Sequence, residues 1–347
     1  MKLIFFPFRL LLAGLSFLVA AGSSVALAAE PYVPAQRMKV VIDNDFCGDP
    51  DGLFQLVHHL LSPSVEVRGI IGSHLTSGFG FNEGKNTAEA SCDKVREVLD
   101  VMGLAGRYAV YVGSPVPMAD PDTPQDSPAA RFIVEEALKA TPEEPLYVVC
   151  GASLTNIASA WLMNPEIGRR VILVWIGGQE YLTAGAIPPP GYSAVEYNLN
   201  LCIASARTVF NKSDLRLWQV PRNAYRQCIY SLAEMEMHVA PCGKTGAYLA
   251  GSITGIMERL GKVGLPMGEV YILGDSPLVL LTALQTGFEA DPASSDYVVR
   301  QAPLIAEDGA YRYNHQGRNI RVYTRIDTRL LFEDFNAKLA MFARKAE

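Results

Sequence analysis

Four aspartates lie close together near the start of the sequence, where a run of apolar residues ends. They are Asp43, Asp45, Asp49 and Asp51, in the segment VVIDNDFCGDPDGLFQL. Carboxylates this close repel one another, and the segment contains no lysine or arginine to neutralise them. A divalent cation with oxygen ligands would neutralise them, and calcium tolerates the irregular geometry of a loop. We therefore predict a calcium site; the alternative is a solvated acidic turn with Asp49 or Asp51 as a helix N-cap.

Polar residues follow three later apolar runs. The segment 150–156, CGASLTN, follows one run, and Asp275 follows another. Glu196, Asn198 and Asn200 alternate in VEYNLN, so they would share one face if that segment is extended, and such side chains suit sugar hydroxyls. Since open parallel sheets bind ligands beyond the carboxyl ends of their strands, we expect these groups near the aspartates. Plain capped helices are the alternative for 150–156 and Asp275.

Short apolar runs alternate with amphipathic segments along most of the chain. This repetition predicts parallel βαβ units, that is, an α/β fold with an open, mostly parallel sheet and helices on both faces. Predicted strands are 38–43, 65–72, 108–113, 145–151, 169–178 and 215–220, with a further strand near the end. Predicted helices are 50–62, 86–104, 128–140, 153–165, 204–213, 231–262, 275–287 and a closing helix.

The first residues have the pattern of a secretory signal. Lys2 and Arg9 accompany an apolar run that ends in small residues at Ala26-Leu27-Ala28. We predict cleavage near Ala28, export to the periplasm or the medium, and a single domain over residues 29–347. An uncleaved membrane anchor is the alternative, although the run is short for a spanning helix. No later stretch is long and apolar enough to span a membrane.

Composition and charge narrow the possible partners. Hydrophobic residues make up 49% of the 347 residues, which is enough for a large core. The net charge is −6, and loss of residues 1–28 removes two bases and no acid, leaving 28 basic and 36 acidic residues, or −8. An acidic exported protein without a basic patch has no electrostatic reason to bind nucleic acid.

The six cysteines show no CxxC pair, so we do not expect zinc. Cys150 lies within an apolar run and is predicted to be a buried free thiol. Export permits disulfides, and Cys228 with Cys242 is the favoured pair because the two flank one helical segment. The pairing is not determined by the spacing.

Five segments together resemble the inosine-uridine-type nucleoside hydrolases. The opening segment is similar to the family's Asp-x-Asp-x-Gly-x-Asp-Asp signature, with a proline inserted between acids as in some branches. The others resemble its Gly-Pro-Leu-Thr-Asn segment, its strand ending in Gly-Gly, its Ala-Glu-Phe-Asn block and its late His-Asp-Pro-Leu block. They are CGASLTNIASAWLMNPEI, VILVWIGGQ, VEYNLNLCIASARTVF and GDSPLVLLTAL, in the family's order between about Lys39 and Leu284.

The resemblance implies one bound calcium ion and hydrolysis of the N-glycosidic bond of ribonucleosides or related ribosyl compounds. Asp45 matches the calcium ligand that takes a proton from the attacking water. Thr155 matches a ligand through its main-chain carbonyl, and Asp275 matches the late carboxylate ligand. Glu196 and Asn198 match residues that hydrogen-bond the ribose. Relatives commonly form dimers or tetramers, and a role in purine and pyrimidine salvage would follow.

Two glycines depart from the family pattern. Asp51 matches the first of the paired acids, a substrate-binding position, and Gly52 falls where the second acid, a calcium ligand, belongs. Asp49 or Asp51 would then have to replace that ligand. Gly274 stands where many members have a histidine proposed to protonate the leaving base.

Two Gly-Asn segments of the family are also missing. The later one is replaced by IPPPGYS and the early one by GSHLTSG, where His74 is either a polar contact or an ordinary exposed loop residue.

The resemblance and the departures from it leave three hypotheses for the function. The leading one is a calcium-dependent N-ribosyl hydrolase. The second is a catalytically lapsed, exported protein that binds nucleosides or sugars on the same fold. The third is a structural protein whose aspartates only cap helices.

Overall fold

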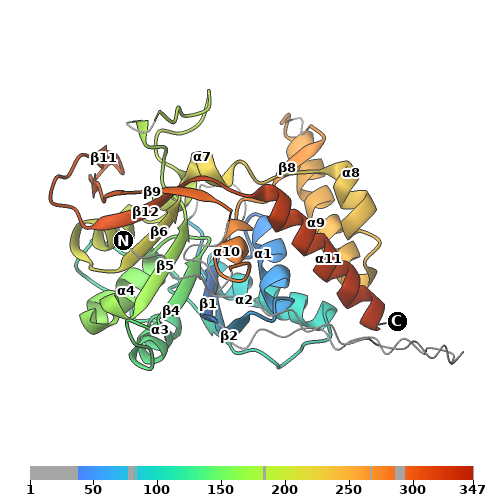
Figure 1. Cartoon of the computed structure of the whole chain (residues 1–347), viewed down its shortest axis with the longest axis horizontal. Helices are drawn as coiled ribbons and strands as arrows, with labels where there is room; N and C mark the ends of the chain where they lie inside the picture. The colour runs from blue at the N-terminus through green and yellow to red at the C-terminus, as the bar shows by residue number, and fades with distance from the viewer. Residues whose placement is uncertain are drawn as a thin grey trace, which may run out of the picture. The chain divides into compact units, whose positions relative to one another are not determined.

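The core of the protein is an eight-stranded sheet in the order β3-β2-β1-β4-β5-β6-β12-β9 (Figure 1). The computed structural model describes residues 38–76, 82, 84–182, 185–265, 268–285 and 294–346, so the predicted signal segment 1–28 lies outside the described residues. The strands are β1 (Met38–Asn44), β2 (Val65–Gly72), β3 (Val110–Val112), β4 (Leu146–Cys150), β5 (Val171–Ile176), β6 (Arg216–Val220), β9 (Asp296–Gln301) and β12 (Asn319–Arg325). Neighbouring strands are parallel except β12 and β9, which confirms the predicted open, mostly parallel sheet.

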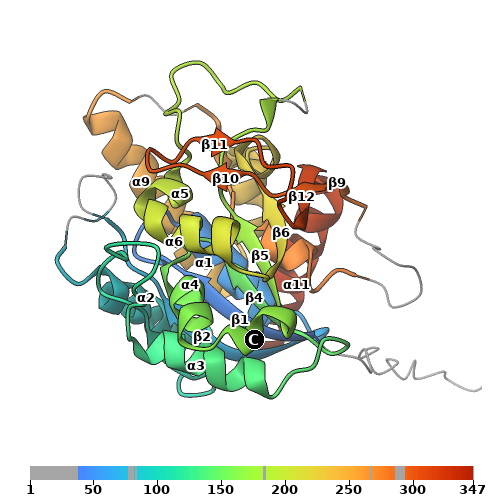
Figure 2. The same cartoon turned by 90° about the vertical axis from the view of Figure 1, so that its left-hand side faces the viewer.

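Helices cover both faces of this sheet (Figures 1 and 2). The longer ones are α1 (Asp51–Leu60), α2 (Thr87–Val101), α3 (Pro128–Leu138), α4 (Thr155–Met163), α9 (Gly243–Lys262) and α11 (Thr328–Ala346). The shorter ones are α5 (Tyr197–Leu201), α6 (Ile203–Arg207), α7 (Arg222–Tyr225), α8 (Leu232–Glu234) and α10 (Pro277–Leu280), with single turns at η1 (Pro165–Arg169), η3 (Thr208–Lys212) and η4 (Met235–Val239). Two small antiparallel pairs add β7 (Ile229–Ser231) with β8 (Val270–Ile272) and β10 (Leu304–Ile305) with β11 (Tyr311–Arg312).

Strand periodicity divides the buried apolar side chains between two cores. Along β1, Val40 and Ile42 point into one core and Val41 into the other, since successive side chains alternate across a sheet. The first core is closed by α1, α2, α9, α10 and α11, and the second by α3, α4 and α6. Both faces of the central strands are therefore buried, which explains why their sequences are continuous apolar runs.

The strand order reverses between β1 and β4. From β1 the chain moves outward to β2 and β3, then returns to place β4 on the other side of β1 and continues to β5 and β6. The carboxyl ends of β1 and β4 thus border the point where crossovers leave in opposite directions, the usual ligand position in open α/β sheets. The aspartate segment follows β1 directly, and helix α1 begins at Asp51.

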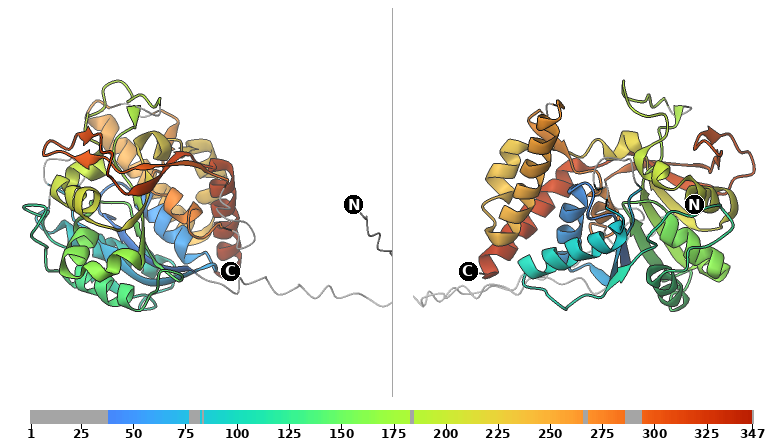
Figure 3. Two further views of the ribbon diagram at one scale, coloured as in Figure 1. Left: turned by 60° about the vertical axis from the view of Figure 1, so that its left-hand side comes forward. Right: turned by 180° about the vertical axis from the view of Figure 1, so that it is seen from behind.

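Two predicted segments differ from the structure. The region 231–262 is not continuous helix: α8 and η4 end before a turn at Pro241, and α9 begins at Gly243, whose φ of 61° is in the left-handed region. These helices lie beside α11, as the front and rear views show (Figures 1 and 3). The segment 196–200 is helical rather than extended, because the Glu196 carboxylate accepts a hydrogen bond from Leu199 N and caps α5.

All six cysteines are unpaired in the described part of the chain, so the predicted Cys228–Cys242 bridge is wrong. Cys242 Sγ instead donates to the carbonyl of His238, and Cys228 is buried in the first core. The prediction for Cys150 is confirmed, since it is a free thiol with no exposed surface. Over the described residues, no helix combines the length and apolar character needed to cross a membrane.

Candidate active site at the carboxyl ends of β1 and β4

One oxygen of Asp45 has no hydrogen-bond partner in the described part of the chain. It follows β1 and is 7% exposed, and its Oδ2 is buried with no hydrogen-bond partner among the described residues. Burial raises the pKa of the Asp45 carboxyl well above its ordinary value, and the charges of Asp275 and Asp49 raise it further. A buried carboxylate oxygen without a donor is costly unless a proton, a ligand or a cation satisfies it.

Asp43 is part of the scaffold beneath the site. Its Oδ1 accepts hydrogen bonds from Ser73 Oγ at 2.6 Å and Asn156 Nδ2 at 3.0 Å, and these partners come from the ends of β2 and from α4. Asn156 Nδ2 also donates to Ser73 Oγ. Burial raises the pKa of Asp43 to about 6, against these hydrogen bonds, which lower it. This carboxyl joins three elements and is fully satisfied by protein partners.

Asn44 connects β1 to Asp275, which precedes α10. Its Nδ2 donates to Asp275 Oδ2 at 2.8 Å and to Gln55 Oε1 at 3.3 Å, and its Oδ1 accepts from Asp45 N. A Cβ placed on Gly52 would lie 2.9 Å from Asn44 Nδ2 and 3.4 Å from Asp275 Oδ2. The amide of Asn44 therefore fills the space into which the missing acid at position 52 would project.

The other two acids of the opening segment also contact residues from the later part of the chain. Asp49 Oδ1 accepts from Tyr271 Oη at 2.7 Å, and Asp51 Oδ2 accepts from Asp275 N at 3.1 Å. Burial raises the pKa of Asp49 to about 6 and that of Asp275 to about 7. The pKa of Asp51 is raised by burial and by the charges of Asp275, Asp49 and Asp45. The predicted ligand carboxylates of Asp45, Asp49, Asp51 and Asp275 thus form one mutually repelling group, in which Asp45 and Asp275 are buried and Asp49 and Asp51 are partly exposed.

Thr155 lies at the start of α4, beside the ends of β1 and β4, where its hydroxyl is 2.9 Å from His74 Nε2. Ser153 Oγ lies 3.2 Å from the same nitrogen and donates to Thr155 Oγ1. His74 has no exposed surface, so an exposed loop residue is excluded, and burial lowers its pKa to about 4. A neutral His74 therefore fixes the residue whose main-chain carbonyl is the predicted ligand.

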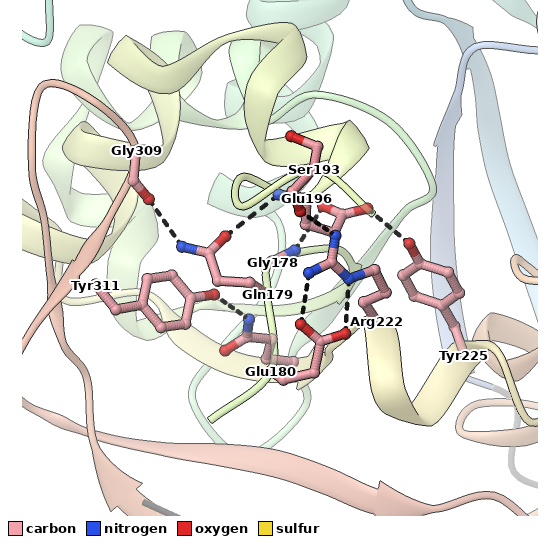
Figure 4. Close-up of polar contacts among 10 residues, drawn as sticks. Gly178, Gln179, Glu180, Ser193, Glu196, Arg222, Tyr225, Gly309 and Tyr311 are labelled. Carbon is pink, nitrogen blue, oxygen red and sulfur yellow. Dashed lines mark hydrogen bonds and ion pairs between the residues drawn. The ribbon is translucent and has the colours of Figure 1, made fainter. Parts of the chain in front are cut away.

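Glu196 is held in one orientation by three donors. Its carboxylate accepts from Gly178 N at 2.7 Å, from Leu199 N at 3.1 Å and from Tyr225 Oη at 3.0 Å, as Figure 4 shows for Gly178 and Tyr225. Burial raises the pKa of Glu196 against these hydrogen bonds. Gly178 has a φ of 84°, and a Cβ there would lie 2.1 Å from Tyr311 Oη, so only glycine fits at this strand end.

Asn198 stands next to the end of β4. Its Nδ2 donates to Ile176 O at 2.9 Å and to Gly151 O at 3.3 Å. Both amide hydrogens are therefore directed at backbone carbonyls, which leaves the side-chain oxygen as the atom that could accept from a sugar hydroxyl.

Tyr225 occupies the space beside Gly274. A Cβ on Gly274 would lie 3.2 Å from Tyr225 Cδ2 and 3.2 Å from Asp51 Oδ2. A larger side chain at 274 would therefore have to displace the ring that holds Glu196. The ring of Tyr225, from α7, lies beside this glycine, and burial raises the pKa of Tyr225 well above its ordinary value.

A buried ion pair lies behind Glu196. Arg222 donates from Nε and Nη2 to the two carboxylate oxygens of Glu180, each at 2.6 Å, and the side chains are 3% and 0% exposed (Figure 4). Arg222 Nη1 also donates to Ser193 O at 2.7 Å, and Arg222 N donates to Gly178 O. The pair thus joins the end of β5, the loop before α5 and the start of α7, which carry the groups around Glu196.

These residues fit a hard cation by chemistry, since the group offers buried carboxylate oxygens and the orphaned Oδ2 of Asp45. The side chains that donate hydrogen bonds to Asp43, Asp49 and Asp275 are neutral hydroxyls and amides, so they do not cancel the negative charge of these carboxylates. Among the described residues, however, no group of three or more His, Cys, Asp or Glu side chains is arranged to hold a metal ion. Asp275 is turned toward Asn44 and Asp49 toward Tyr271, so the predicted ligand set, Asp45, Asp49, Asp51, Thr155 and Asp275, stays a prediction.

The same fold is found in several solved structures of low sequence identity. A plant nucleoside hydrolase, the PpNRh1 enzyme, is 16% identical with a TM-score of 0.69, covering 87% of this chain and 99% of its own. The purine-preferring ribonucleoside hydrolase from Gardnerella vaginalis is 18% identical with a TM-score of 0.68, covering 88% and 99%. The type III effector protein XopQ, complexed with adenosine diphosphate ribose, is 14% identical with a TM-score of 0.56, covering 90% and 93%. At this identity the likeness shows the fold alone.

The sequence places the chain among the nucleoside hydrolases more directly. The family model of the inosine-uridine preferring nucleoside hydrolases matches residues 40–333. The match spans most of the chain, and the protein belongs to this family. No curated protein matches the sequence.

Two residues of the site, Asn44 and Tyr225, were not predicted from the sequence. Asn44 stood within the aspartate segment but is uncharged, and its partner Asp275 is 231 positions away. Tyr225 lies in a four-residue helix without any motif. The one signal was negative: Gly52 and Gly274, where the family pattern has larger residues, mark the space that these two side chains fill.

A helix position normally gains stability when glycine is replaced by alanine. Gly52→Ala is expected to do the opposite, because its Cβ would press on Asn44 Nδ2; we expect a loss of about 1–3 kcal/mol, of the order of an overpacked core. Gly255→Ala on α9, where a Cβ meets nothing within 4 Å, is the matched control and should gain up to about 1 kcal/mol. Urea unfolding measures both, and equal gains at the two sites would contradict the crowding at Gly52.

Proposed function

We propose that this protein is a calcium-dependent hydrolase of the N-glycosidic bond of ribonucleosides or related ribosyl compounds. The observation that carries the proposal is the orphaned, buried Oδ2 of Asp45 among carboxylates at the carboxyl ends of β1 and β4. Membership of the nucleoside hydrolase family supports it. We also propose export, from the pattern of residues 1–28.

Some residues of the site act on the attacking water, and others bind the sugar. Asp45 accepts the proton of the attacking water, since its Oδ2 has no competing donor among the residues that the structure describes. Glu196, fixed by Gly178, Leu199 and Tyr225, and the amide oxygen of Asn198 hold the ribose hydroxyls. Negative charge beside the sugar stabilises an oxocarbenium-like transition state.

The carboxylates of Asp45, Asp49, Asp51 and Asp275, with the carbonyl of Thr155, would hold the ion. A bound calcium ion would lower the pKa of the attacking water and orient the ribose hydroxyls. Gly52 supplies no ligand, so Asp49 or Asp51 would have to replace the carboxylate missing at this position.

The proposal predicts that calcium stabilises the protein more at high pH than at low pH. The folded pKa values of Asp49 and Asp275 are raised to about 6 and about 7, above the ordinary value near 3.8. In the presence of a chelator, the contribution of these two carboxyl groups to the stability should be greatest below about pH 4. It should fall as pH rises through about 6 to 7, because the unfolded chain releases their protons first.

Calcium binds the ionised carboxylates, so the rise in Tm on adding calcium should grow over the same pH range. Differential scanning calorimetry with excess calcium or with chelator, near pH 5 and near pH 8, measures this directly. Asp45→Asn should reduce the calcium-dependent rise at the higher pH. An equal rise at both pH values would show that calcium does not bind these carboxylates.

Turnover of a panel of purine and pyrimidine nucleosides, with and without a chelator, tests the activity itself. Release of free base that stops on chelation is the expected result. Absence of hydrolysis across the panel, together with no effect of Asp45→Asn, would contradict the proposal.

A second function, ligand binding without turnover, is favoured by one observation. Gly52 and Gly274 remove a cation ligand and a proton donor, and Asn44 and Tyr225 fill the vacated space with hydrogen-bonded side chains. Such a site would bind a nucleoside or a ribosyl compound and leave it intact. Calorimetry showing ribose or nucleoside binding without base release would establish this alternative.

A further inference from the structure

A chain of buried polar side chains runs from the candidate site into the first core. Asn44 Nδ2 donates to Gln55 Oε1 at 3.3 Å, Gln55 Nε2 contacts His59 Nδ1, and His59 Nε2 lies 3.0 Å from Thr282 Oγ1. Thr282 Oγ1 in turn donates to the carbonyl of Leu278 at 2.6 Å. Four side chains form this hydrogen-bonded chain, and each is at most 2% exposed: Asn44, Gln55, His59 and Thr282.

One assignment of the hydrogens agrees with all of these side-chain contacts. Burial lowers the pKa of His59 to about 3, and the charges of His58 and Lys338 lower it too, so His59 is neutral. Thr282 gives its hydrogen to Leu278, so it accepts from His59 Nε2, and His59 Nδ1 accepts from Gln55 Nε2. Gln55 Oε1 then has to face Asn44 Nδ2.

This direction of donation fixes the orientation of Asn44. With Nδ2 held toward Gln55 and Asp275, Asn44 Oδ1 faces the backbone N–H of Asp45. A flipped amide would turn its oxygen toward the Asp275 carboxylate and its nitrogen toward the Asp45 N–H, and both contacts are repulsive. Asp275, the Asp45 N–H and Gln55 therefore all favour the one orientation of Asn44 that donates to Asp275.

Space links the same amide to Gly52. A Cβ at 52 would lie 2.9 Å from Asn44 Nδ2, so an acid at 52 and the present Asn44 cannot both be accommodated without a shift. Gly151, at the end of β4, is equally close, since a Cβ there would lie 2.6 Å from Asn44 Nδ2 and 2.7 Å from Asp275 Oδ1. Two glycines thus make room for the contact between Asn44 and Asp275.

We propose that Asn44, oriented by Gln55 and His59, is the positioning residue that holds Asp275 in the site in place of the carboxylate missing at position 52. The proposal deepens the proposed function and rests on it for the ligands concerned. Asp275 keeps Oδ2 against Asn44, and its orientation depends on a chain that ends at Thr282, which is not among the predicted ligands. Outer hydrogen-bond partners of this kind orient the ligands of metal sites and tune their affinity.

The test compares two changes within helix α1. Gln55→Met keeps the volume of the side chain but removes the donor and the acceptor that orient Asn44. His58→Gln is the matched control: His58 is also buried on α1, but its Nε2 contacts Asp334 on α11 and takes no part in the chain. Isothermal titration calorimetry measures the dissociation constants of calcium and of ribose for both variants and the wild-type protein.

We expect Gln55→Met to weaken calcium and ribose binding by about tenfold. His58→Gln should lower Tm while leaving both dissociation constants at their wild-type values. A folded Gln55→Met variant with wild-type constants, or equal weakening by both variants, would overturn the positioning role.

Failure of the proposed function gives a different result. If the wild-type protein binds neither calcium nor ribose, the N-ribosyl hydrolase proposal fails, and the positioning role is then decided in chelator-treated protein. A double-mutant cycle of Gln55→Met and Asp275→Asn measures their coupling in urea unfolding. Non-additive losses support the role, and additive losses overturn it, since Asn44 donates to both of these side chains.

Discussion

Asp45→Asn is expected to lower kcat/KM for nucleoside hydrolysis by about 10³-fold, within the range for loss of a general base. An amide cannot take the proton of the attacking water, and it puts donor hydrogens where Asp45 Oδ2 now has no partner among the described residues. Steady-state release of free base measures the effect. Stability should not fall, because the change removes a buried charge that Asp275 and Asp49 repel.

Asp43→Asn is the matched control for this experiment. Asp43 lies two residues earlier on the same strand, is equally buried, and has its oxygens satisfied by Ser73 and Asn156. Burial raises the pKa of Asp43 and so disfavours its charge, and the amide introduced by Asp43→Asn would keep an oxygen for Ser73 and Asn156, so we expect most of the activity to remain. Equal losses in the two variants would indicate damage to the strand end rather than loss of a base.

Arg222→Ala is expected to cost about 3–5 kcal/mol of stability, the usual result of leaving one member of a buried ion pair alone. Glu180 has no exposed side-chain surface and receives two hydrogen bonds from Arg222. The loss of Arg222 Nη1 also releases Ser193 O, and with it the loop before α5. The KM for a nucleoside should therefore rise along with the loss of stability, because Glu196 follows this loop.

Arg325→Ala provides the comparison for an exposed pair. Arg325 and Asp296 are 54% and 63% exposed, and such pairs contribute about 0–1 kcal/mol. Urea unfolding of both variants gives the difference. Replacing Arg222 and Glu180 together by methionine and leucine should recover much of the stability, because no buried charge is then left alone. A small loss in Arg222→Ala would mean that water reaches Glu180 readily.

Much of the fold follows from local patterns. The continuous apolar runs of β1, β4 and β5 predict strands buried on both faces, and the apolar face of α1 predicts a covering helix. The ends of these strands also predict where a ligand binds. What local patterns cannot supply is the antiparallel strand β9, which has exposed apolar residues and depends on pairing with β12 for its definition.

Part of the candidate site could also be predicted from local patterns, and part could not. Asp45, Glu196 and Asp275 were predicted because charge stands out at strand ends. The helical conformation of 196–200 was missed, since the cap that starts α5 is Glu196, which is not among the side chains most favoured at N-caps. Asn44 and Tyr225 were missed because their roles depend on contacts with residues far along the chain, Asp275 and Glu196.

The shared space between positions 44 and 52 has a consequence for related sequences. Because a Cβ at 52 would come within 2.9 Å of Asn44 Nδ2, the two positions should vary together. Family members with an acid at the position of Gly52 should carry a side chain other than asparagine at the position of Asn44, and the pair Asn with Gly should recur as a unit. Within such a subgroup, a single substitution at either position passes through a disfavoured intermediate, so this version of the site would change by paired replacements.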